Sequence, residues 1–271
     1  MRPLGRSWIL AAAWLVIVSL GALSAPWLAP AAPGAVDAAH SLAPPSQASW
    51  LGTDLLGRDV FSRMLWGARR TLGMSLVAVA ISSLAGASLG MLAGYSGEPW
   101  DTWLMRGAEV IMAIPQLLLA LIVISALGSG PWPVGLSVGI AGVAGFARLV
   151  RTSVQQVRGL AFIQAAEALG ANGFQIGLWH VLPNIAAPLT TYASIYFAWA
   201  ILNTSALTFL GFGGNPIIPD WGMILNEGRA YLLSAPWIST APGLAIALTV
   251  LAVNTFGRIE QSVVPAAARQ P

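Results

Sequence analysis

The sequence predicts an all-α membrane protein with six transmembrane helices. Hydrophobic residues make up 56% of its 271 positions and charged residues only 8%, against about 25% charged residues in a typical soluble domain. Uncharged runs recur along the chain, and a helix needs roughly 20 apolar residues to cross the hydrocarbon. No segment alternates with period two, as the strands of a membrane barrel do. These observations exclude a soluble globule and a disordered chain.

Six runs are long and apolar enough to span. The uncharged stretch after Val110 is too long for one helix, and the loop-forming sequence from Gly128 to Pro133 divides it. Prolines at 115, 188 and 242 lie in or near spans and can kink them, because proline lacks a backbone donor. The predicted spans are Trp8–Trp27, Leu72–Gly94, Trp103–Leu127, Val134–Val150, Ile185–Leu207 and Ser239–Phe256.

Arginine distribution predicts the orientation. With the N-terminus inside, the cytoplasmic segments hold eight of the thirteen arginines and the outer segments five. Both termini are therefore expected in the cytoplasm. The chain divides into an N-terminal helix (1–29), an extracytoplasmic segment (30–71), a core of five spans (72–257) and a cytoplasmic tail (258–271).

The first span has an alternative interpretation as a cleavable signal peptide. Arg2 and Arg6 precede an apolar stretch, and Ala22-Leu23-Ser24 resembles a cleavage site. The stretch continues through Trp27, which is long for a signal peptide, so an uncleaved span is favoured.

Glycines recur every fourth residue in the second span, at Gly86, Gly90 and Gly94, and again at Gly135 and Gly139 in the fourth. This spacing lets helices approach closely, either within the chain or against another subunit. Residues 86–90 also match the hydrolase pattern G-x-S-x-G, but that motif needs a strand before it and a helix after it.

The segment from about 154 to 184 is the most informative loop. Strong helix formers from Ala161 to Leu169 predict a short helix, and Gly170 is a natural stop. A second short helix is expected to end before Pro183. The pair would form an L-shaped protrusion that presents Ala165 and Ala166 to another protein. The alternative is an ordinary loop on the membrane surface.

This loop resembles the EAA loop of bacterial ABC-importer permeases. Gln164-Ala165-Ala166 is followed after three residues by Gly170, and Leu182-Pro183 keeps the family spacing. Gln164 stands where the family usually has glutamate, and Glu167 where arginine is common.

Two further stretches resemble the C-type permeases of dipeptide, oligopeptide and nickel importers. They are the sequence from Trp50 to Arg63 and the sequence Phe209-Leu-Gly-Phe-Gly213 with the residues after it. The resemblance runs from Trp50 to Asn254, whereas Gly257-Arg258 departs from the family's usual Gly-Asp ending.

The resemblance implies a type I ABC-importer permease fold and a subunit that moves peptides or a related small solute, such as a nickel complex, by alternating access. It implies a homologous second permease, two cytoplasmic ATPase subunits, an extracytoplasmic substrate-binding protein and a place in the bacterial inner membrane. The chain lacks the P-loop motif, so ATP belongs to the partners and the chain itself is not an enzyme. No catalytic residue, metal, cofactor or nucleic acid is expected. The implied ATPase-coupling residues are Gln164, Ala165, Ala166, Glu167, Gly170, Leu182 and Pro183.

Polar residues within spans are candidates for the translocation path. Asn203, Thr204 and Ser205 lie late in the fifth span and Asn254 lies late in the sixth. Such groups face the bundle interior or a water-filled path, although hydroxyls can equally bond their own helix.

Four charged residues at helical spacing, Asp54, Arg58, Asp59 and Arg63, suggest a self-paired amphipathic helix or part of the outer mouth.

Two other function classes are compatible with an apolar chain of this kind. A stand-alone channel would need no partners. An intramembrane hydrolase would pair Ser88 or another serine with His180, but the predicted spans place Ser88 mid-membrane and His180 in a cytoplasmic loop.

Overall fold

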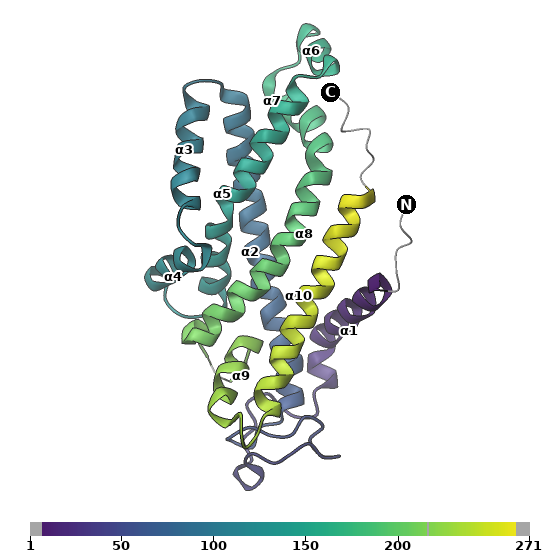
Figure 1. Ribbon diagram of the computed structural model, residues 1–271, viewed down its shortest axis with the longest axis vertical. Coiled ribbons are helices and arrows are strands. Elements are labelled where there is room, and N and C mark those ends of the chain that lie inside the picture. Colours follow the sequence, from purple (N-terminus) through teal and green to yellow (C-terminus); the bar gives the residue numbers. More distant parts are fainter. Residues whose placement is uncertain (1–6, 216, 264–271) are drawn as a thin grey trace.

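The computed structural model describes residues 7–215 and 217–263, which form an elongated helical bundle (Figure 1). Five of its helices are long and apolar enough to cross a membrane, and a bent pair, α3 and α4, makes a sixth candidate. The all-α membrane fold predicted from the sequence is therefore confirmed. The long helices are α1 (Ser7–Leu28), α2 (Val60–Ser96), α5 (Pro131–Arg158), α8 (Leu182–Leu207) and α10 (Trp237–Val263). The shorter ones are α3 (Trp100–Met112), α4 (Gln116–Leu127), α6 (Ala161–Ala168), α7 (Gly173–Gln175) and α9 (Trp221–Gly228).

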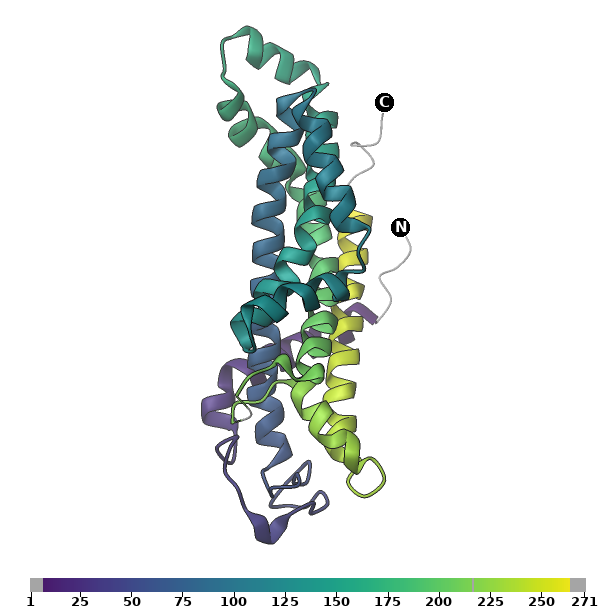
Figure 2. The same cartoon turned by 90° about the vertical axis from the view of Figure 1, so that its left-hand side faces the viewer.

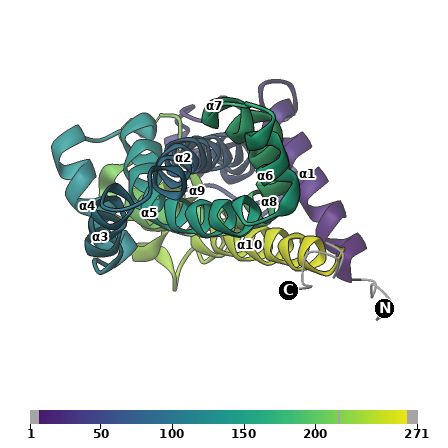
Figure 3. The same cartoon turned by 90° about the horizontal axis from the view of Figure 1, so that it is seen from above.

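The two ends of the bundle are built differently. At one end, here the α6 end, helix α6 projects beyond the long helices (Figure 2). At the other, here the α9 end, residues 30–63 pack with α9. Seen along the bundle, α1 lies on one side and α3 and α4 on the other, with α2, α5, α8 and α10 between them (Figure 3).

Glycines join α2 and α5 closely. A Cβ added at Gly90 would lie 2.5 Å from the carbonyl oxygen of Ala147, and one added at Gly94 would lie 2.7 Å from a methyl carbon of Val154. Gly139 of α5 approaches the Cβ of Ile81 in the same way, at 2.9 Å. The internal-packing alternative for these glycines is confirmed, because α2 and α5 belong to one chain.

The third predicted span, Trp103–Leu127, is not one straight helix. α3 ends at Met112, α4 begins at Gln116, and the two axes differ by 93°. Pro115 adopts an extended ψ of 128° and has no N–H to donate back into α3, so the helix stops before it.

The second short helix expected before Pro183 is also different. α7 continues through a π-helical segment, η2 (Ile176–Val181), directly into α8, so that residues 173–212 form one candidate span. Pro183 lies where the π-helical pattern of η2 gives way to the α-helical pattern of α8, so its missing N–H falls at the junction of the two patterns. The wider π turns accommodate the entry into α8 without a break.

The first helix packs onto the last. The Trp14 indole Nε1 donates to the hydroxyl of Thr249 at 3.0 Å, and Val18 and Ala22 are buried in a cluster with residues of α10. α1 continues as helix through Pro26. The arginines at 2, 6 and 269, used for the orientation, and the tail positions 264–271 lie outside the described residues.

Candidate coupling and translocation sites

Helix α6 ends in a Schellman motif centred on Gly170. Gly170 has a φ of +88°, its N–H donates to the Glu167 carbonyl at 2.9 Å, and the N–H of Ala171 reaches back to the Ala166 carbonyl at 3.1 Å. Glycine is favoured here because the left-handed conformation strains residues with a Cβ. The predicted stop is confirmed. The chain then re-enters helix at Asn172, whose side chain accepts from the Gln175 N–H in a capping box.

Six of the seven predicted coupling residues are exposed. Gln164, Ala165, Glu167 and Gly170 are exposed on or just after α6, and Ala166 is half-buried. Leu182 and Pro183 are exposed too, but they lie on α8 beyond η2. The structure therefore groups the residues from 164 to 170 and places the other two on a separate helix.

One apolar side chain holds α6 to the bundle. Ile163 is fully buried in a cluster with Val154 and Val157 of α5 and with Ile176 of η2. A displacement of α6 would therefore act directly on α5 and, through η2, on α8.

The large apolar side chains around α6 are exposed, a feature that was not predicted from the sequence. Leu169 is 89% exposed, and Phe162, Phe174 and Trp179 are also exposed. Phe162, Leu169 and His180 line a cleft of about 520 Å³ beside Ala165 and Ala166. Exposed apolar residues in a segment expected to lie outside the membrane were the available signal, because such patches mark contact surfaces.

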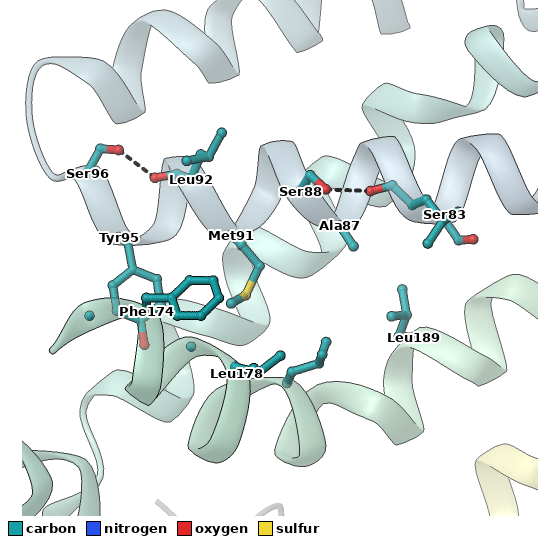
Figure 4. Close-up of a pocket in the computed structure, with 14 residues that line it drawn as sticks. Ser83, Ala87, Ser88, Met91, Leu92, Tyr95, Ser96, Phe174, Leu178 and Leu189 are labelled. Atoms are coloured by element: carbon teal, nitrogen blue, oxygen red, sulfur yellow. Dashed lines mark hydrogen bonds between the residues drawn. The ribbon is translucent and has the colours of Figure 1, made fainter. Parts of the chain in front are cut away.

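An apolar groove of about 820 Å³ lies between α2 and the segment from α7 to α8 (Figure 4). Phe174, Leu178 and Leu189 form one wall, and Met91 of α2 lies on the other. The serines of α2 add little polarity, since their hydroxyls donate to carbonyls of their own helix: Ser83 to Ala80, Ser88 to Leu84 and Ser96 to Leu92.

The same contacts bear on the hydrolase alternative. Ser88 lies inside the uninterrupted helix α2, with no strand before it, and its hydroxyl donates to the Leu84 carbonyl at 2.8 Å. No hydrogen bond between Ser88 and His180 exists among the described residues, and His180 lies against the ring of Phe162. The arrangement is not that of a catalytic pair.

Below α6, polar contacts fasten the helices. Arg151 of α5 makes a bidentate ion pair with Asp101 of α3, with N–O distances of 2.5 and 2.6 Å. Arg158 donates to the Gly94 carbonyl at 2.9 Å and lies over the ring of Tyr95. The α5 residues that make these contacts reach no further than Arg158, the last residue of α5, so none of these contacts involves α6.

Three of the four predicted path residues are buried in the interior of the chain. Asn203 donates to the Trp199 carbonyl, and Thr204 donates to that of Ala200 and lies 3.1 Å from the hydroxyl of Ser75. The hydroxyl of Ser205 is buried without a partner in the described part of the chain. Asn254, on α10, is half-buried. Five cavities of about 270 to 820 Å³ over the described residues are lined by other side chains.

The α9 end holds a buried ion network. The Arg58 Nε donates to Asp54 at 2.6 Å, and Arg58 and Arg63 both donate to Glu227 of α9, at 2.9 and 2.7 Å. Arg63 has no exposed surface. Burial raises the pKa of Glu227, while the neighbouring guanidinium groups of Arg63 and Arg58 lower it.

The predicted amphipathic helix from Asp54 to Arg63 is wrong. Residues 51–59 form turns, helix α2 begins only at Val60, and Asp59 caps it by accepting from the Ser62 N–H at 2.7 Å. Within the turn, Asp54 accepts from both the backbone N–H and the side chain of Arg58. The charges also pair across elements, because the guanidinium groups of Arg58 and Arg63 both reach Glu227 of α9.

Comparison with known proteins agrees with this architecture. The chain matches the family model described as binding-protein-dependent transport system inner membrane component over residues 86–269, more than half of its length.

Curated relatives match over most of the chain. It is 41% identical to the glutathione transport system permease protein GsiD of Pectobacterium atrosepticum over 79% of this chain and 71% of that one. It is 37% identical to the probable D,D-dipeptide transport system permease protein DdpC of Escherichia coli, over 90% of this chain and 82% of that one. It is also 37% identical to the dipeptide transport system permease protein DppC of Alkalihalophilus pseudofirmus, over 92% of this chain and 83% of that one.

Among solved structures, the fold is similar to that of a chain of the MetNI methionine ABC transporter in an inward-facing conformation. The TM-score is 0.60 at 18% identity, covering 76% of this chain and 97% of that one. The chain thus has the type I importer fold and belongs to the binding-protein-dependent inner-membrane transport family, in which it is an ABC-importer permease subunit, a multi-pass inner-membrane protein and not itself an enzyme.

Proposed function

We propose that this permease moves peptides, or a small solute related to them such as a nickel complex, across the inner membrane by alternating access. The names of its relatives, which include dipeptide and glutathione permeases, support this substrate class. The working complex would contain a homologous second permease, two cytoplasmic ATPases that bind ATP, and an extracytoplasmic binding protein. This chain would need no cofactor or metal of its own.

The observation that carries the proposal is the exposed α6 with its apolar surroundings. Ala165 and Leu169 offer an uncharged surface beside a cleft, which suits insertion into a groove of an ATPase. Gln164 replaces the usual acidic residue, so docking here would depend on apolar contact more than on charge.

Coupling would follow from the packing of Ile163. When ATP closes the ATPase pair, a movement of α6 would be passed to α5 through Ile163 and to α8 through the continuous segment of residues 173–212. Uphill transport requires that ATP binds the two conformations of the complex with different free energies.

An arginine at the docking surface tests this proposal. In a reconstituted complex, Ala165→Arg is expected to lower ATPase affinity at least tenfold, because a charge would be desolvated in the groove without a partner. Copurification and peptide-stimulated ATP hydrolysis measure the effect. The matched control is Ala39→Arg, at an exposed alanine of the α9 end. Unchanged transport and copurification in Ala165→Arg would show that α6 is not the docking element.

The same proposal places the α6 end and both termini in the cytoplasm. The sequence contains no cysteine, so single cysteines can be introduced at exposed Ser46 and Asn172. In intact cells, a membrane-impermeant thiol reagent is expected to label Ser46→Cys and to spare Asn172→Cys. The reverse pattern would invert the topology.

A further inference from the structure

The break between α3 and α4 leaves irregular backbone between two apolar helices that together are long enough for one membrane span. Ala113 and Pro115 are exposed, although the sequence around them is apolar and uncharged. Non-helical backbone is tolerated within a bilayer only where it is buried in protein or lines a water-filled space. The N–H groups of Ala113 and Ile114 donate to the carbonyls of Glu109 and Ile111, yet Ala113 and Pro115 stay exposed, so this surface is open to a polar space or to another subunit.

A cavity of about 320 Å³ opens beside this break. Gln116, the first residue of α4, donates from its side-chain nitrogen to the Tyr196 hydroxyl at 2.8 Å, and that hydroxyl donates to the Val138 carbonyl at 2.7 Å. These bonds fix Gln116 and leave its amide oxygen free to accept. The cavity therefore has an oriented polar wall.

A second polar group lies in the same cavity. Tyr192 of α8 stacks edge-on against Phe146, with centroids 4.7 Å apart, yet its hydroxyl has no hydrogen-bond partner in the described part of the chain. Gly145 makes room for this hydroxyl, because a Cβ there would lie 2.6 Å from it. Trp199, which is exposed, adds an aromatic face.

No charged side chain lines this cavity among the described residues. Its free groups are an amide oxygen and a hydroxyl, which complement the N–H and C=O of a peptide bond. They offer no countercharge for a free ion. Aromatic rings beside them contact apolar side chains without strict selection.

We propose that this cavity is where the permease touches its solute in transit, and that it takes the uncharged amide portion of a peptide through Gln116 and Tyr192. The proposal rests on the import function proposed above and gives it a location. It differs from the path predicted from Asn203, Thr204, Ser205 and Asn254, none of which lines this cavity.

Cysteine protection tests the location. Met112 lines the cavity and is 44% exposed, whereas Leu118 on α4 is 51% exposed and does not line it. In the reconstituted complex with its binding protein and ATP, a mixture of dipeptides and glutathione is offered, and the imported species are identified by mass spectrometry. During turnover, these solutes are expected to slow thiol labelling of Met112→Cys at least threefold and to leave Leu118→Cys unchanged.

A hydroxyl deletion tests the chemistry. Tyr192→Phe is expected to raise the KM for imported peptides about fivefold, while ATP hydrolysis stimulated by the binding protein persists. Tyr231→Phe, at the α9 end, is the matched control. If the unmodified complex imports nothing, the proposed function fails. If it imports peptides but neither the labelling nor the KM responds, the cavity is not on the path.

Discussion

The α6 end and the α9 end of the bundle are held in place by opposite kinds of interaction. At the α9 end, Arg58 and Arg63 are buried against Asp54 and Glu227, and the turns that precede α2 are held by backbone bonds. At the α6 end, residues 161–172 make no ion pair with any described residue, and Ile163 is their one fully buried side chain.

The difference assigns a role to each end. A network of buried charges has one good arrangement, because separating the partners would leave uncompensated charge in a poorly solvated site. The α9 end therefore resists movement and suits a part of the permease that keeps one conformation. A helix held by a single apolar anchor and stopped by a glycine can shift at little cost, which suits a part that a partner grips.

The largest effect is expected from a substitution that disrupts the buried ion network of the α9 end. Arg63→Met leaves Glu227 and Asp54 short of a buried cation, and we expect the free energy of unfolding to fall by about 3 kcal/mol. Denaturation by SDS in mixed micelles measures it. Arg69→Met is the control on the same helix, since Arg69 is exposed and makes only a distant contact with the Trp66 ring; it should cost less than about 1 kcal/mol. Equal losses in the two variants would remove the distinction between the ends.

A smaller effect is expected at the movable end. In Gly170→Ala the added Cβ has no atom within 4 Å, so the substitution destabilises α6 only through the left-handed backbone, by about 1–2 kcal/mol. The α6 amides should therefore exchange hydrogen roughly 5–30 times faster, with unfolding of the bundle little changed. Gly173→Ala, also without close neighbours but at a negative φ, is the control and should not alter exchange. A global loss of stability in Gly170→Ala would mean that α6 is part of the core.

The smallest effect is expected from a change of charge on the exposed surface of α6. Gln164→Glu restores the usual family residue on an exposed site. We expect ATPase affinity to change by less than about 1 kcal/mol, because exposed ion pairs contribute little, and the change should vanish at high salt. Affinity measured at two ionic strengths decides this. A large effect that persists in salt would show that the docked site is buried and charge-driven.

Some elements were predictable because their cause is local. The spans follow from uncharged runs of sufficient length, and the stop at Gly170 follows from the conformational freedom of one residue. The cap at Asp59 could have been found in the same way, since an aspartate directly before a helical run is typical of a helix start.

Other elements depend on distant partners. A proline in a membrane helix indicates a kink, but the 93° turn at Pro115 needs a place for α4 to pack, which α5 and α8 provide through the cluster around Ala120 and Ile124. The sequence left open whether the polar residues 203–205 face the bundle interior or a water-filled path, and only the packing of α8 buries their side chains.

By itself, then, the sequence determined that the chain crosses a membrane with helices, and its spaced motifs indicated a permease with a docking loop. Hydropathy and single-residue conformation suffice for that, because they act over a few turns of chain. Only the tertiary structure decided that Arg58 and Arg63 meet Glu227, more than 160 positions away, and that Gln116 and Tyr192 line one cavity. Those meetings depend on how helices far apart in sequence come to lie side by side, and no local preference encodes them.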